Sequence, residues 1–118
     1  MVSHWLGWIS LALCIVLLAK FVGRISKNRK LNQLLRRIHK PLGSAILVVG
    51  LLHGILCFAE MLQASVALMT GVLLIACFAA LTGTFYAKAK LKARWFSLHR
   101  KLSLLAVLLL AVHVILAI

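Results

Sequence analysis

The chain has 118 residues, of which 64% are hydrophobic, and it carries fourteen lysines and arginines against a single acidic residue. A chain this apolar exceeds what a soluble core of this length can bury, which excludes a soluble globular domain. The cations lie in two short loops between long apolar runs, so the formal net charge of +13 does not indicate a nucleic-acid-binding protein. The composition predicts a single-domain integral membrane protein over residues 1–118.

Four apolar runs are predicted to span the membrane, at residues 5–22, 38–59, 64–87 and 96–118. Each has about the 20 residues that a helix needs to cross a hydrocarbon core of roughly 30 Å. An open chain in lipid must satisfy its backbone polar groups within each segment, which leaves the helix as the only choice. We therefore predict an all-α fold, a membrane four-helix bundle. The first run lacks a basic leading segment and a cleavage site, which favours a retained helix over a signal peptide.

The basic residues set the predicted orientation. All fourteen fall in or beside the loops that join the first span to the second and the third to the fourth. The positive-inside rule then places both loops in the cytoplasm and both termini outside. In this orientation the second and fourth spans are parallel, and the expected location is a bacterial cytoplasmic (inner) membrane.

The first basic loop contains four apolar residues at helical spacing: Leu31, Leu34, Leu35 and Ile38. This pattern is typical of either a short helix at the headgroup surface or an extension of the second span. Pro41 is tolerated if the spanning helix begins near residue 40, whereas a helix that begins near Asn28 should be kinked there. Both alternatives remain open at the level of sequence.

Two spans carry histidines at the same spacing, in HKPLGSAILVVGLLH (residues 39–53) and HRKLSLLAVLLLAVH (residues 99–113). Fourteen residues of α-helix make about 3.9 turns, so the two histidines of each span face the same way within about 40° and are separated by about 21 Å. Because the two spans are expected to be parallel, His39 should face His99 near the inner surface, and His53 should face His113 toward the outer one.

Each predicted histidine pair is suited to a haem iron. The separation of about 21 Å excludes one four-histidine metal site, and zinc prefers three or four protein ligands. Haem iron takes two axial ligands on opposite faces of its ring, so we predict two haem b groups held by His39 with His99 and by His53 with His113. No Cys-x-x-Cys-His motif occurs, so the attachment should be non-covalent. The alternative for each histidine is a hydrogen bond to a neighbouring helix.

Other residues are candidates for contact with these cofactors. Small residues on the histidine-bearing faces would make room for a flat ring, or else simply allow close helix packing: Gly43, Gly50, Ser103 and Ala106. In the first and third spans, the pairs Ser10 with Gly23 and Thr70 with Gly83 would also open space. Basic residues near the inner pair would meet haem propionates, or else serve only as positive-inside cations: Arg36, Arg37, Lys40, Arg100 and Lys101. The three cysteines, Cys14, Cys57 and Cys77, are expected to be reduced, buried small hydrophobes.

The paired His-x13-His helices resemble the diheme four-helix core of the cytochrome b superfamily, which includes respiratory cytochrome b and the membrane domains of ferric reductases and NADPH oxidases. The resemblance covers essentially the whole chain and rests on spacing more than on any run of letters. It implies electron transfer across the membrane through two bis-histidine b haems. The chain departs from the pattern of respiratory cytochrome b at Ser10 and Thr70, where that family often has glycine.

The expected function is therefore that of a small membrane cytochrome, or of the membrane subunit of a quinol- or metal-reductase-type oxidoreductase. Compatible redox partners are a quinol, a flavoprotein, or an external flavin or metal acceptor, and the basic face would also contact membrane lipid. One alternative is a small proton-coupled multidrug exporter, although Glu60 falls at a span end rather than deep in the membrane. Another is a structural membrane subunit without a cofactor.

Overall fold

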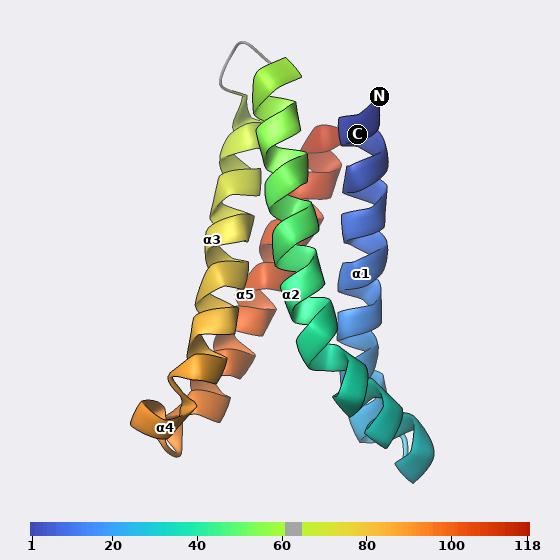
Figure 1. Ribbon diagram of the computed structural model, residues 1–118, viewed down its shortest axis with the longest axis vertical. Helices are drawn as coiled ribbons and strands as arrows, with labels where there is room; N and C mark the ends of the chain where they lie inside the picture. The colour runs from blue at the N-terminus through green and yellow to red at the C-terminus, as the bar shows by residue number, and fades with distance from the viewer. Residues whose placement is uncertain (61–64) are drawn as a thin grey trace. The chain divides into compact units, whose positions relative to one another are not determined.

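A computed structural model describes residues 1–60 and 65–118 of the protein. The described residues form four long helices, α1 (Val2–Ile25), α2 (Arg29–Glu60), α3 (Val66–Tyr86) and α5 (Arg94–Ala117), and one short helix, α4 (Lys88–Leu91) (Figure 1). The four long helices are long and apolar enough to cross a membrane. The predictions of an all-α fold and of four spans are confirmed. Ala64, the first residue of the predicted third span, lies outside the described residues.

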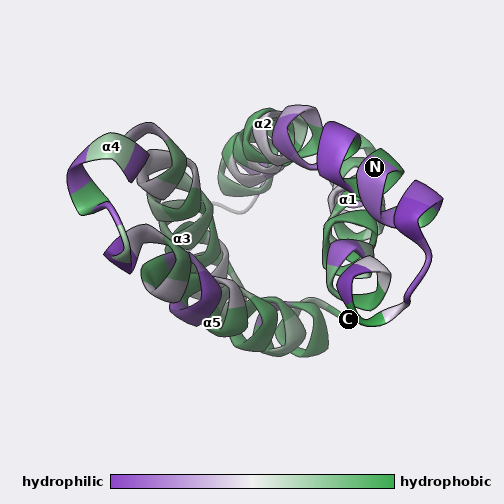
Figure 2. Cartoon of the chain, turned by 90° about the horizontal axis from the view of Figure 1, so that it is seen from below, coloured by the Kyte–Doolittle hydropathy of each residue, from purple (hydrophilic) through white to green (hydrophobic). Residues whose placement is uncertain are grey.

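The chain divides into two compact units, residues 1–53 and 54–118. In Figure 2, hydrophobic residues run along the long helices, while hydrophilic residues gather at the α1–α2 connection and around α4. Large apolar side chains such as Phe21, Phe58 and Leu108 are exposed. An apolar surface of this extent drives association in water but needs no cover in hydrocarbon, so it supports the assignment to a membrane.

The first unit is a hairpin of α1 and α2. Asn28 caps α2, since its side-chain oxygen accepts hydrogen bonds from the backbone N–H groups of Lys30 (3.1 Å) and Leu31 (3.3 Å). Gly23 of α1 is buried, and a Cβ atom there would overlap the side chain of Leu35 on α2. The absence of a side chain at residue 23 therefore lets the two helices approach closely beside their connection.

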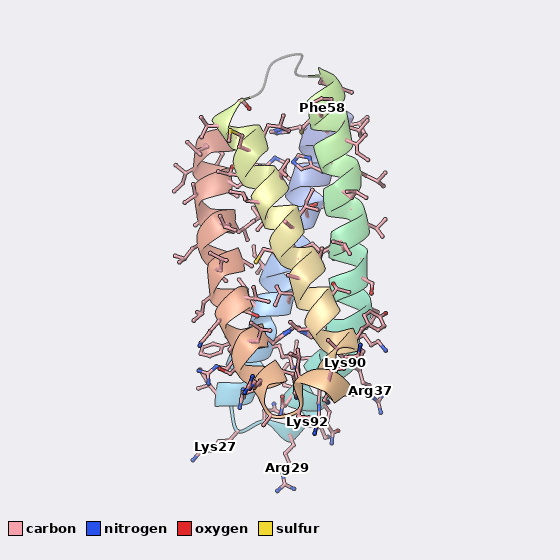
Figure 3. All side chains as sticks on the ribbon, turned by 90° about the vertical axis from the view of Figure 1, so that its left-hand side faces the viewer. Lys27, Arg29, Arg37, Phe58, Lys90 and Lys92 are labelled. Carbon is pink, nitrogen blue, oxygen red and sulfur yellow. The ribbon has the colours of Figure 1, made fainter. Side chains whose placement is uncertain are left out.

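Helix α2 settles the question raised by Pro41. The helix has 32 residues, begins at Arg29 and contains Pro41 in its interior, so the amphipathic segment of the loop is an extension of the second span. A proline interrupts the helical ladder because it has no N–H, and the ribbon of α2 bends in this N-terminal half (Figure 1). At 1.5 Å per residue the helix is about 48 Å long, well beyond a hydrocarbon core of about 30 Å. Figure 3 shows Lys27, Arg29 and Arg37 around this end of the hairpin and Phe58 near the other end of α2.

The second unit is built on the antiparallel pair α3 and α5. Ser65 caps α3 by accepting a hydrogen bond from the Leu68 N–H at 3.1 Å. Leu74, Cys77 and Ala106 form the buried core between the two helices. The small side chain of Ala106 gives α3 close access to α5, and the Cys77 thiol donates to the Leu102 carbonyl at 3.4 Å. Of the three cysteines, Cys14 and Cys77 are buried as predicted, and Cys57 is only half-buried.

The turn between α4 and α5 contains an unusual backbone conformation. Lys92, which is exposed, has φ 51° and ψ −121°. Positive φ brings the Cβ atom of an L-residue against its own backbone, a conformation that glycine adopts without this cost. The turn therefore stores strain at Lys92.

Replacing Lys92 should distinguish backbone strain from charge. We expect Lys92→Gly to be about 1 kcal/mol more stable than Lys92→Ala, because both remove the ammonium group and only glycine relieves the strain. Unfolding of the purified protein in detergent, followed by circular dichroism, measures the difference. Equal stability of the two variants would show that the turn is unstrained.

Candidate histidine sites

The four predicted ligand histidines lie in two helices, His39 and His53 in α2 and His99 and His113 in α5. All four are half-buried. Each pair is carried by one helix, and in α2 Pro41 lies between the two histidines. Contacts within each unit show how the imidazole rings are held.

His53 is held by the first turns of α1. Its Nδ1 atom lies 2.7 Å from the carbonyl oxygen of Ser3, fifty residues away in the sequence. A carbonyl only accepts hydrogen bonds, so Nδ1 carries the proton, and a neutral ring then keeps its lone pair on Nε2. A Cβ atom at Gly7 would lie 3.0 Å from Cε1 of His53. The imidazole edge therefore rests on the bare backbone of Gly7.

His113 is held by α3 in the same manner. Its Nδ1 lies 3.0 Å from the carbonyl oxygen of Ala67 and 3.1 Å from Oγ1 of Thr70. The Thr70 hydroxyl donates to the same Ala67 carbonyl at 2.8 Å, so its oxygen is left to accept from the histidine. A Cβ atom at Gly71 would lie 3.1 Å from Cε1 of His113. Two acceptors thus share the Nδ1 proton.

The glycines explain why the carbonyls are accessible. In an α-helix the carbonyl of residue i bonds to the N–H of residue i+4. Gly7 stands in this relation to Ser3, and Gly71 stands in it to Ala67. Without a side chain at i+4, the carbonyl oxygen is open to a second donor from the neighbouring helix. The same arrangement occurs in both hairpins.

His99 is held differently. Its Nδ1 lies 3.1 Å from Oγ1 of Thr84, whose hydroxyl donates to the Leu81 carbonyl at 2.6 Å. Thr84 is buried. Its hydroxyl hydrogen is already donated to Leu81, so its oxygen accepts a hydrogen bond from the Nδ1–H group of His99. The Trp95 ring lies 6.0 Å from the His99 ring between centroids, and Nζ of Lys88 lies 4.6 Å from the centroid of a Trp95 ring. These contacts place His99 beside the basic end of α3 and α5.

The hydrogen bonds define what these rings can do chemically. His53, His99 and His113 each present Nδ1 to an acceptor on the neighbouring helix. This is the arrangement of metal-ligating histidines, in which the second ring nitrogen donates outward and the first keeps its lone pair for the metal. It equally satisfies the buried N–H of a histidine without a metal. The fit to a metal ligand is therefore good at three of the four positions.

The other predicted residues fall into three groups. A Cβ atom at Gly43 or Gly50 in α2 would meet no atom of the described residues within 4 Å, so these positions border open space. Ser103 donates to the His99 carbonyl at 2.7 Å, and Ala106 packs in the α3–α5 core. The predicted propionate partners are all exposed: Arg36, Arg37, Lys40, Arg100 and Lys101. Cofactor contact at each of these positions stays a prediction.

Sequence reasoning missed five residues that hold the histidines: Ser3, Gly7, Ala67, Gly71 and Thr84. One signal was available, because Thr70 and Thr84 are fourteen residues apart, the same spacing as His99 and His113 on the facing helix. The earlier pairing of Thr70 with Gly83 is not the one that contacts histidine, and a Cβ atom at Gly83 would meet nothing described within 4 Å. Ser3 contacts His53 through its backbone carbonyl, so the identity of its side chain does not reveal this role.

In the described part of the chain, no three His, Cys, Asp or Glu side chains gather into a metal-binding group. Comparison with protein-family models, with curated proteins and with solved structures gave no match. The functional inference therefore rests on the histidines and their partners.

Two glycines of α3, Gly71 and Gly83, offer a matched test of the contact between His113 and the backbone of Gly71. Gly71→Ala should lower the stability of the protein by about 1 kcal/mol or more, since the new methyl crowds the imidazole. Gly83→Ala makes the same chemical change in open space and should leave stability unchanged or raise it by up to about 1 kcal/mol. Thermal unfolding in detergent measures both, and an equal response would show that His113 does not rest on Gly71.

Proposed function

We propose that the protein is a diheme b-type cytochrome that transfers electrons across a membrane, with His39 and His99 ligating one iron and His53 and His113 the other. The observation that carries the proposal is the outward hydrogen bond from Nδ1 of three of these histidines, at 2.7 to 3.1 Å. The pairing of histidines between the two helices is taken from the equal fourteen-residue spacing in the sequence.

The donor set supports haem over other groups. Four imidazoles in an apolar protein suit iron porphyrin, whose large faces are themselves apolar and whose iron takes two axial ligands. The open space beside Gly43 and Gly50, on the same helix as His39 and His53, is what a flat ring requires.

Bound haem supplies a one-electron couple, in which the iron alternates between ferric and ferrous forms. The chain supplies the rest. The Ser3 and Ala67 carbonyls and the Thr84 hydroxyl hold each Nδ1 proton in place, so that the lone pair that would bind the iron is on Nε2. The apolar helices would exclude water from the rings. The negative charge of propionates would be balanced by the basic residues predicted for this role: Arg36, Arg37, Lys40, Arg100 and Lys101. With two histidines on each iron, no position is left for substrate, which favours electron transfer over catalysis at the metal.

The proposal includes a location and a class of partner. The basic loops would lie in the cytoplasm of a bacterial cell, with both termini on the outer side of the inner membrane. Electrons would pass between a donor such as a quinol or a flavoprotein and an acceptor such as an external flavin or metal. The basic surface around α4 would attract an acidic partner or anionic lipid.

Haem content tests the proposal directly. The purified protein should carry two haem b per chain by pyridine haemochrome assay, with a reduced-minus-oxidised spectrum that exogenous carbon monoxide does not change. His53→Ala and His113→Ala should each leave one haem, and the double variant should also leave one, because the two residues share an iron. His39→Ala and His99→Ala should remove the other haem.

His4 provides the matched control. It is exposed, and its Nε2 accepts a hydrogen bond from the Trp8 indole at 3.0 Å, so His4→Ala should keep both haems. A colourless wild-type protein from haem-replete cells would refute the proposal and favour an exporter or a structural subunit. Full haem content in His53→Ala would refute the ligand assignment.

The orientation is tested with reporter fusions. An alkaline phosphatase domain, active only outside the cytoplasm, should be active when joined at either terminus and inactive when inserted at Lys27 or Lys90, in the two basic connections shown in Figure 3. Activity at Lys27 or Lys90 would reverse the predicted topology.

A further inference from the structure

Two threonines of α3 stand in equivalent places beside the two histidines of α5. Thr70 and Thr84 each place Oγ1 at 3.1 Å from a histidine Nδ1, of His113 and His99 respectively. Each hydroxyl donates to the carbonyl three residues earlier, at 2.8 Å for Thr70 and 2.6 Å for Thr84. The two side chains therefore look interchangeable when each is considered alone.

The backbone behind them differs. His113 has a second acceptor, the Ala67 carbonyl at 3.0 Å, because Gly71 leaves that carbonyl open. At the level of His99 the corresponding carbonyl belongs to Leu81, and the residue four positions on is Phe85. The Thr84 hydroxyl donates to the Leu81 carbonyl, and its oxygen accepts the hydrogen bond from His99 Nδ1. At His99 a side-chain hydroxyl therefore takes the place of the main-chain carbonyl that contacts His113.

This difference has a consequence for a bound metal. A hydrogen bond donated by Nδ1 increases the electron density on Nε2, which stabilises the more positive, oxidised metal and lowers its reduction potential. A hydroxyl that donates its own hydrogen to a carbonyl is a stronger acceptor, because successive hydrogen bonds polarise one another. The Thr84 hydroxyl is therefore an effective acceptor for His99, and a substitution at residue 84 can remove it.

We propose that Thr84 is a positioning residue that sets the reduction potential of the iron bound by His99, while Thr70 has little influence on the iron bound by His113. The proposal rests on the proposed haem ligation. Thr84 acts through the tautomer and basicity of His99 and does not touch the cofactor. Trp95, whose ring lies beside that of His99, limits movement of the imidazole when the hydroxyl is removed.

The test compares valine at the two threonines, since valine keeps the shape and removes the hydroxyl. Redox titration of the purified diheme protein should show that Thr84→Val raises the potential of the haem assigned to His99. The expected change is about tenfold in the ratio of reduced to oxidised iron at a fixed potential, or about 59 mV. Thr70→Val should shift the potential of the other haem by less than a third of this, because the Ala67 carbonyl remains.

Two further variants separate this role from a loss of packing. Thr84→Ser keeps the hydroxyl and should restore the wild-type potential. Thr82→Val removes a hydroxyl that donates to Phe78 at 3.0 Å within its own helix, and it should leave both potentials unchanged. Equal shifts in Thr84→Val and Thr70→Val, or no shift in Thr84→Val, would overturn the proposal while two bound haems would still uphold the proposed function.

A measurement without haem covers the case in which Thr84→Val binds haem poorly. The 15N chemical shifts of the imidazole rings in the haem-free protein report which nitrogen carries the proton. His99 should lose its preference for the Nδ1–H tautomer in Thr84→Val, whereas His113 should keep it in Thr70→Val. Retention of the Nδ1–H tautomer by His99 without Thr84 would overturn the proposal.

Discussion

A buried imidazole N–H in an apolar helical hairpin must have a hydrogen-bond acceptor, and this requirement governs how the two hairpins of the protein are built. Lipid offers no partner, so along the apolar part of a hairpin the acceptor comes from the neighbouring helix. The His53–Ser3 contact fixes the register of α2 against α1, and the His113–Ala67 and His99–Thr84 contacts fix α5 against α3. The same contacts orient the rings and place the proton on Nδ1, which leaves the lone pair on Nε2 that the proposed metal ligation requires.

Much of the fold follows from the pattern of charge and hydropathy. The four apolar runs became four long helices, because a segment in hydrocarbon has no other way to satisfy its backbone. The start of α2 at Arg29 differs from the predicted span start at residue 38, and the reason is physical. Charge marks where lipid ends, whereas a helix continues as long as its residues permit, and the apolar positions from Leu31 to Ile38 favour continuation. Pro41 could not decide the matter, since it is compatible with a helix start and with a kinked interior.

The candidate site divides along a similar line. The histidines were predictable because their side chains recur at the same fourteen-residue spacing, which Thr70 and Thr84 share. Ser3 and Ala67 were not predictable, because their contribution is a carbonyl that every residue possesses. Gly7 and Gly71 make room for the histidine rings because they have no Cβ atom. This role becomes apparent only when the structure places a histidine against each glycine. Sequence therefore identifies the groups that do chemistry more readily than the backbone that supports them.

The contrast between carbonyl and hydroxyl acceptors bears on how such a protein evolves. Mutations at residues 3 and 67 change a side chain but preserve the main-chain oxygen, so the acceptors of His53 and His113 persist through substitutions at these two positions. Position 84 has no such protection, and a single codon change there alters the surroundings of His99. The surroundings of His99 are thus open to adjustment by selection, whereas the main-chain acceptors of His53 and His113 persist when their side chains change.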